Sequence, residues 1–120
     1  MNFSQAIQVH TEWKSRLQAL SRGRSSEKID AATVMQDRSC ELGRWLYGEG
    51  QKYAADPKLR ELMELHVSFH QCAGAIAEMV ERGQAAEAAA LLSTPDSEFN
   101  RLSLRVIAIL MGLRSRYRDG

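Results

Sequence analysis

The sequence lacks the features that mark several classes of protein. It has only two cysteines, two prolines, two tryptophans and three histidines in 120 residues. No apolar run approaches the roughly 20 residues that a membrane-spanning helix needs. The first residues lack a basic segment followed by an apolar one, so we expect no signal peptide. Two cysteines without a secretion signal predict a reducing cytoplasm, where a cysteine is a free thiol or a metal ligand.

Charge of either sign is not in excess. Sixteen Lys and Arg residues almost balance fifteen Asp and Glu residues, which gives a formal net charge of +1. A balanced chain has no bulk electrostatic attraction to nucleic acid or to an anionic membrane surface, so we expect neither as a partner. The length suits one domain, residues 1–120, with a single hydrophobic core.

Helix-favouring residues are abundant, while β-branched and aromatic residues are few. Apolar residues recur at spacings of three and four, which is typical of amphipathic helices. We expect long helices over about residues 2–21, 25–46, 56–83 and 95–117, with a short helix over 84–92. Ser25 or Ser26 would cap the second of these, and Asp56 followed by Pro57 would start the third. The pattern predicts an all-α four-helix bundle with an additional short helix.

The last predicted helix is apolar on more than one side. Besides its main stripe it carries Leu104, Ile107 and Met111. The extra apolar surface has two interpretations, a dimer interface or a helix at the centre of its own bundle. The sequence favours neither over the other.

All three histidines, His10, His66 and His70, fall on the apolar stripes of their helices. One histidine in such a place is usually a hydrogen-bonded core residue, but three out of three favour a shared site. His66 and His70 are four residues apart, so they differ by only about 40° around a helix and both rings can reach one point. Helical zinc sites use this pairing, although by itself it is a weak signal.

Two cysteines are available to complete such a site. Cys72 is two residues past His70 and therefore turned roughly 200° from it, so we interpret it as a small buried hydrophobe. His10 and Cys40, on other predicted helices, could supply the third and fourth ligands of a tetrahedral zinc. Spacing alone does not place Cys40 beside the histidines.

Three segments resemble the chemoreceptor zinc-binding (CZB) domain, a bacterial module found on chemoreceptors, on diguanylate cyclases and as a free-standing protein. They are His10-Thr11-Glu12-Trp13, Cys40-Glu41-Leu42-Gly43-Arg44-Trp45-Leu46-Tyr47-Gly48 and His66-Val67-Ser68-Phe69-His70. The resemblance runs from about residue 3 to about residue 117. It implies a helical bundle that commonly dimerises, and a zinc ion held by His10, Cys40, His66 and His70.

Two residues near Cys40 bear on this site. Asp37 could accept a hydrogen bond from a ligating histidine, or it could be a solvated surface acid. Gly43 lies inside a predicted helix, where glycine costs roughly 1 kcal/mol relative to alanine. Its presence suggests that two helices approach closely near the metal.

Four filled positions argue against an enzyme, because a catalytic zinc keeps one position open for water. Val67 follows His66 where a helical metalloprotease would have its glutamate. The residues three before the histidines are Ile7, Met63 and Val67, which excludes the Glu-x-x-His pairs of di-iron bundles.

Three functions remain open. The first is a zinc-responsive regulatory module acting on a signalling partner of the chemoreceptor or diguanylate cyclase type. The second is oxidant sensing, with a molecule such as hypochlorous acid attacking zinc-bound Cys40. The third is an adaptor or dimerisation module in which zinc is only structural. We find no output domain in the sequence, so we expect the chain to act on a separate partner or to be part of a longer protein.

Overall fold

The computed structural model describes residues 1–24 and 29–117, and within these ranges it is helical, with no β-strand. The all-α class is therefore confirmed. The elements are α1 (Phe3–Ser21), α2 (Ala31–Val34), α3 (Glu41–Tyr47), α4 (Pro57–Glu81), α5 (Ala85–Ser93) and α6 (Glu98–Tyr117), with 3-10 helices η1 (Asp37–Ser39) and η2 (Glu49–Tyr53) on either side of α3. Across the described residues we find no helix that is both long enough and apolar enough to cross a membrane.

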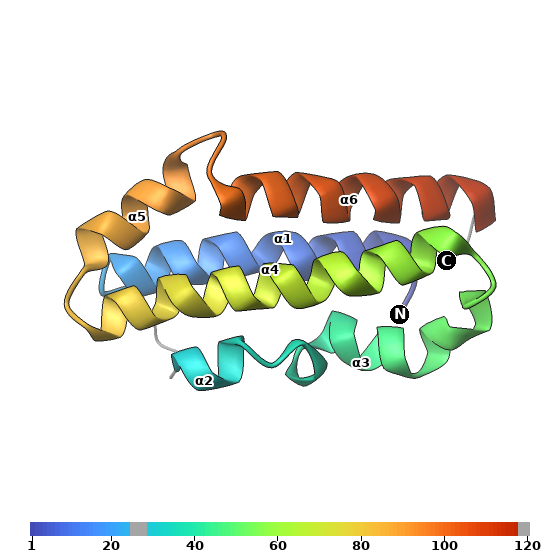
Figure 1. Ribbon diagram of the computed structural model, residues 1–120, viewed down its shortest axis with the longest axis horizontal. Coiled ribbons are helices and arrows are strands. Elements are labelled where there is room, and N and C mark those ends of the chain that lie inside the picture. The colour runs from blue at the N-terminus through green and yellow to red at the C-terminus, as the bar shows by residue number, and fades with distance from the viewer. Residues whose placement is uncertain (25–28, 118–120) are drawn as a thin grey trace.

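The long helices α1, α4 and α6 pack along one another (Figure 1). The segment from α2 to α3 lies against α4 on the side opposite α6, and α3 also contacts α1. The connector α5 packs at the end of the molecule where α4 finishes. The molecule is elongated, with extents of 43 × 26 × 20 Å.

The long helices begin and end where their sequences predict. Asn2 and Gln5 form a reciprocal capping box at the start of α1, with hydrogen bonds of 2.8 and 2.9 Å. Asp56 accepts a hydrogen bond from the Lys58 N–H at 2.9 Å and so caps α4. After α4, Gly83 takes a φ of +82°, which stops the helix at low steric cost.

The prediction of one continuous helix over about 25–46 was wrong. From residue 29 onward the described chain forms α2, η1 and α3 instead, because polar side chains cap short elements in place of helix propagation. Asp30 accepts the Thr33 N–H at 2.7 Å and caps α2. Cys40 is extended (φ −87°, ψ 159°) and caps α3, with its Sγ 3.2 Å from the Gly43 N–H. The Ser25 or Ser26 cap that we predicted lies outside the described residues.

Gly43 makes this break possible. A Cβ at this position would lie 1.7 Å from the backbone oxygen of Asp37, so no side chain fits there. The close approach that we predicted at Gly43 is therefore within the turn between η1 and α3, not between two long helices. The consequence is that Cys40 leads into α3 from an extended backbone and faces the interior.

The outer side of α6 keeps apolar residues in solvent. Leu104 is 64% exposed and Met111 is 48% exposed, with half-buried Ile107 between them in sequence. A helix at the centre of its own bundle would bury these side chains, so that interpretation is wrong for Leu104 and Met111. Dimerisation through this face stays a prediction.

Candidate metal centre

The centre of the structure holds two histidines from α4. His66 and His70 are one turn apart and are 1% and 0% exposed, with ring centroids 4.5 Å from each other. Apolar residues surround them, since Trp13 packs its ring edge to face against His70 at 5.3 Å and Phe69 packs similarly at 5.6 Å. The predicted same-face pairing of the two rings is confirmed.

Cys40 joins these histidines from the start of α3. Its Sγ lies 3.3 Å from Nε2 of His66. One potential ligand atom from each of Cys40, His66 and His70 lies within 4.8 Å of the others. The extended backbone at Cys40 brings the thiol to the histidines, which helix periodicity did not predict.

His10 lies beside this group but outside it. Its buried ring packs 4.4 Å from Phe69, and its Nε2 is 3.0 Å from the hydroxyl oxygen of Ser103 on α6. Phe69 also packs against His70, so one ring separates His10 from the group. The structure therefore brings together three of the four predicted ligands, and the role of His10 stays a prediction.

The hydrogen bond of His70 fixes which of its nitrogens can bind a metal. Nδ1 lies 2.7 Å from the backbone carbonyl of Val34. A carbonyl can only accept, so Nδ1 carries the proton and Nε2 of the neutral ring keeps its lone pair. Nε2 is buried and has no hydrogen-bond partner among the described residues. Metal-binding histidines commonly show this arrangement, in which a backbone carbonyl holds the distal ring nitrogen.

Asp37 takes a position that favours one of the two interpretations made from sequence. Its carboxylate is half-buried, accepts the Tyr47 O–H at 2.8 Å and lies 3.8 Å from Nδ1 of His66. A carboxylate on that side of the ring favours a proton on Nδ1 and a lone pair on Nε2, the nitrogen that faces Cys40. Asp37 is therefore not simply a solvated acid.

Burial keeps the histidines uncharged. Burial, with a smaller effect of the nearby His70, lowers the pKa of His10 to about 4 and that of His66 to about 3. Burial also lowers the pKa of His70, although the Val34 carbonyl opposes this effect. The pKa of the Cys40 thiol is raised, again by burial, against the N–H groups of Gly43 and Leu42. At neutral pH the site thus offers neutral imidazoles and a protonated thiol.

These residues fit a zinc ion. With zinc–ligand bonds of about 2.0–2.3 Å, the edge of a tetrahedron that joins a nitrogen and a sulfur is roughly 3.5 Å. The 3.3 Å between Cys40 Sγ and His66 Nε2 is close to that edge. Neutral imidazoles and one thiolate are the ligand types that zinc prefers. Ordinary core histidines would have both ring nitrogens hydrogen-bonded, whereas Nδ1 of His10 and Nε2 of His70 are buried without partners among the described residues.

Two residues that support the site were not predicted, Val34 and Ser103. Val34 contributes only its backbone carbonyl, for which the side-chain pattern carries no signal. Ser103 is an ordinary polar residue on α6, and only the packing of α6 against α1 brings it to His10. The predicted exclusion of Cys72 agrees with the structure, because it is half-buried and lies outside the ligand group.

Comparison with known families gives one match. The family described as "Chemoreceptor zinc-binding domain" matches residues 10–77, more than half of the chain. This range contains His10, Cys40, His66 and His70. No curated protein and no solved structure matches the chain.

The buried histidines predict how acid affects the metal-free chain. In the unfolded chain a histidine has a pKa near 6.5, and in the folded chain the pKa is lowered. Below pH 6.5 the unfolded state therefore binds more protons, and the free energy of unfolding falls as the pH is lowered. Near pH 5 unfolding should take up about two protons at His10 and His66, with a further contribution from His70.

Urea unfolding between pH 7 and 4.5, with a chelator present, measures this slope before most carboxylates titrate. His10→Gln should reduce the uptake by about one proton. A free energy of unfolding that is constant over this range would show that the histidines are not buried in the uncharged form.

Proposed function

This chain belongs to the chemoreceptor zinc-binding domain family, and we propose that it is a zinc-responsive regulatory module that holds one zinc ion through His10, Cys40, His66 and His70. One observation carries the proposal: uncharged histidine nitrogens that have no hydrogen-bond partner among the described residues lie buried beside a thiol. Nε2 of His70 is such a nitrogen, and Cys40 Sγ is 3.3 Å from His66. When bound, zinc supplies a positive charge to which these buried lone pairs and the thiolate can donate.

His10 is the proposed fourth ligand. Its Nδ1 has no partner within the described part of the chain, so it can bind zinc while Nε2 keeps its contact with Ser103. The alternative is that three protein ligands leave one position for water or another group. The proposed closed set accounts for a regulatory role without catalysis.

The position of the ligands suggests how zinc would regulate. They come from α1, from the start of α3 and from α4, which are three separate elements of the chain. Zinc would therefore tie together elements that are otherwise held by side-chain packing. We propose that occupancy changes the surface formed by α1 and the α2–α3 segment, and that a signalling protein of the chemoreceptor or diguanylate cyclase type reads this change.

Native mass spectrometry of the untagged chain tests the zinc site. The wild type should carry one zinc per chain, and His70→Ala and Cys40→Ser should each weaken zinc affinity by about 100-fold or more, because each loses a direct ligand. Cys72→Ser is the matched control and should keep zinc. His10→Ala should weaken zinc affinity if there are four protein ligands and should leave it unchanged if there are three. A wild-type chain that is folded but does not bind added zinc would refute the proposal.

A second candidate function is oxidant sensing, and the position of Cys40 favours it. Cys40 is 7% exposed, more than His10, His66 or His70. Burial raises its thiol pKa, so metal-free Cys40 is a weak nucleophile, whereas a zinc-bound thiolate keeps nucleophilic character.

Hypochlorous acid should therefore release zinc from the wild type and equally from Cys72→Ser, which a colorimetric zinc indicator can follow. Cys40→Ser, loaded at excess zinc, should show no such release because it has no thiolate to oxidise. Release from that variant at the wild-type rate would exclude Cys40 as the oxidant target.

We also propose that the chain forms a homodimer through the outer side of α6, where Leu104, Ile107 and Met111 lie on one face.

Leu104→Ser should weaken the dimer, raising its dissociation constant by about tenfold in sedimentation equilibrium. Leu91→Ser, on α5 and 40% exposed, is the matched control. An unchanged dimer in Leu104→Ser would place the interface elsewhere, and equal association with and without zinc would favour the adaptor function.

A further inference from the structure

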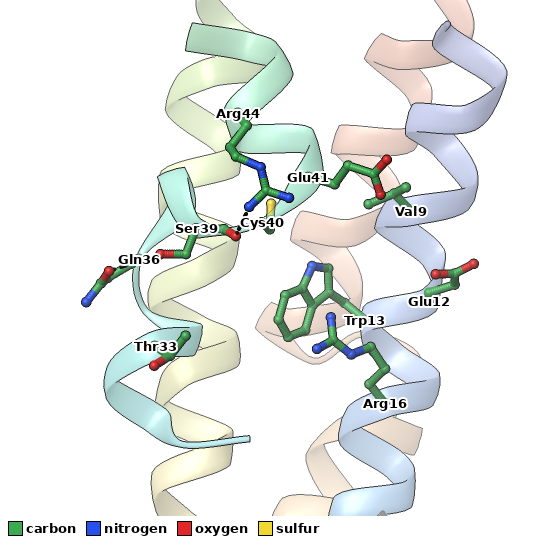
Figure 2. A pocket seen from close by; sticks show the side chains of 10 residues that line it. All are labelled: Val9, Glu12, Trp13, Arg16, Thr33, Gln36, Ser39, Cys40, Glu41 and Arg44. Atoms are coloured by element: carbon green, nitrogen blue, oxygen red, sulfur yellow. Dashed lines mark hydrogen bonds between the residues drawn. The ribbon is translucent and has the colours of Figure 1, made fainter. Parts of the chain in front are cut away.

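A cleft opens beside the candidate metal centre. It has a volume of about 290 Å³ and lies between α1 and the α2–α3 segment (Figure 2). Trp13 of α1 and Cys40 at the start of α3 form part of its lining. The space admits a small molecule and is too small for a segment of another protein.

Cys40 connects this cleft to the metal centre. It lines the cleft, whereas His10, His66 and His70 do not, and their exposed fractions are 2% or less. A solute that enters the cleft therefore meets the sulfur before it meets any of the imidazoles. The cleft is thus a route from solvent to the site that passes through Cys40.

Two guanidinium groups face the cleft. Arg44 donates to the backbone oxygen of Ser39 at 2.7 Å, which holds its head group beside Cys40. Arg16 places its guanidinium carbon 4.0 Å from the centre of the Trp13 ring, on the other side of the cleft (Figure 2). Both cations are fixed by specific contacts, Arg44 by a hydrogen bond and Arg16 by its stacking on an aromatic face.

Two carboxylates also belong to the lining, but they are turned elsewhere. Glu12 points away from Cys40, and the carboxylate of Glu41 lies beside Val9 (Figure 2). Glu12, Glu41 and Arg44 are all exposed, so solvent screens each charge alike, and Arg44 differs in that its head group lies beside Cys40. On the cleft side, the charge held next to the sulfur is therefore that of Arg44.

We propose that this cleft is a port that admits small anions to Cys40, with Arg44 and Arg16 as its selectivity residues. The proposal rests on the proposed function, because it assigns the chemical class of molecule that reaches the zinc thiolate. Small anionic oxidants and small anionic chelators share this chemistry. Positive groups held in a narrow cleft raise the local concentration of anions and hence their rate of reaction.

A pair of thiol reagents of similar size tests the port. Iodoacetate carries one negative charge and iodoacetamide carries none. With either one, the sulfur of Cys40 displaces iodide, so that an S–C bond forms as the C–I bond breaks. The reaction is run on the full chain with the background change Cys72→Ala, and intact-protein mass spectrometry follows it. The ratio of the two rates cancels the intrinsic reactivity of the sulfur, and it is compared between variants at the same zinc occupancy because bound zinc also attracts anions.

The port predicts a ratio of iodoacetate rate to iodoacetamide rate that exceeds the ratio for free glutathione. Arg44→Gln should lower the protein's ratio by about threefold or more, and high salt should do the same. Arg16→Gln should also lower the ratio. If circular dichroism shows that Arg44→Gln does not fold, the Arg16→Gln variant decides the test. Arg60→Gln, on α4 and away from the cleft, makes the same change in net charge and should leave the ratio unchanged.

A ratio equal to that of glutathione, or one that no arginine variant changes, would overturn the port. Zinc content is measured separately for each variant. If the chain binds one zinc but Cys40 shows no preference for iodoacetate, only the port is refuted. If the chain binds no zinc, the proposed function is refuted even when the ratio of rates behaves as predicted.

Discussion

The structure depends on the burial of imidazole rings that carry no charge. A buried nitrogen without a hydrogen-bond partner costs about 1–3 kcal/mol, and both His10 and His70 have such a nitrogen. These histidines lie at the centre of the core, where apolar side chains would pack without leaving a polar atom unpaired. A bound cation would remove this cost at each nitrogen that it binds. Burial lowers the histidine pKa values, so protons bind these nitrogens only in acid. At neutral pH the unpaired nitrogens therefore favour the binding of a metal ion.

The position of Cys40 follows from a helix that does not form. Residues 31–47 have the composition of one helix but fold as two short α-helices separated by the 3-10 helix η1, and the thiol caps α3. As a cap, the sulfur points inward toward His66 while one side stays open to the cleft beside Arg44. A cysteine in the middle of a helix would have only one face for both contacts. The broken segment therefore gives the proposed site a thiol that lies beside His66 and also lines the cleft.

Much of this architecture could be predicted from the sequence, and the exceptions have physical causes. The long helices follow from periodicity and caps, and the pairing of His66 with His70 follows from helix geometry alone. The apolar spacing that predicted the second helix was misleading, because Met35, which fits that spacing, is exposed. Only the family resemblance placed Cys40 at the histidines, since local spacing has no information about a contact between distant segments. The contact between His10 and Ser103 depends on how α6 packs, which no local pattern encodes.

The central claim is that the site presents neutral imidazoles and one protonated thiol to a closed zinc coordination sphere. Counting protons during zinc binding tests this claim most directly. Isothermal titration calorimetry near pH 7, in buffers with different ionisation enthalpies, gives the number released. The account predicts about one proton per zinc, from Cys40, with none from the histidines and none from a metal-bound water. Release of two or more protons, or zinc binding that leaves the Cys40 thiol protonated, would contradict it.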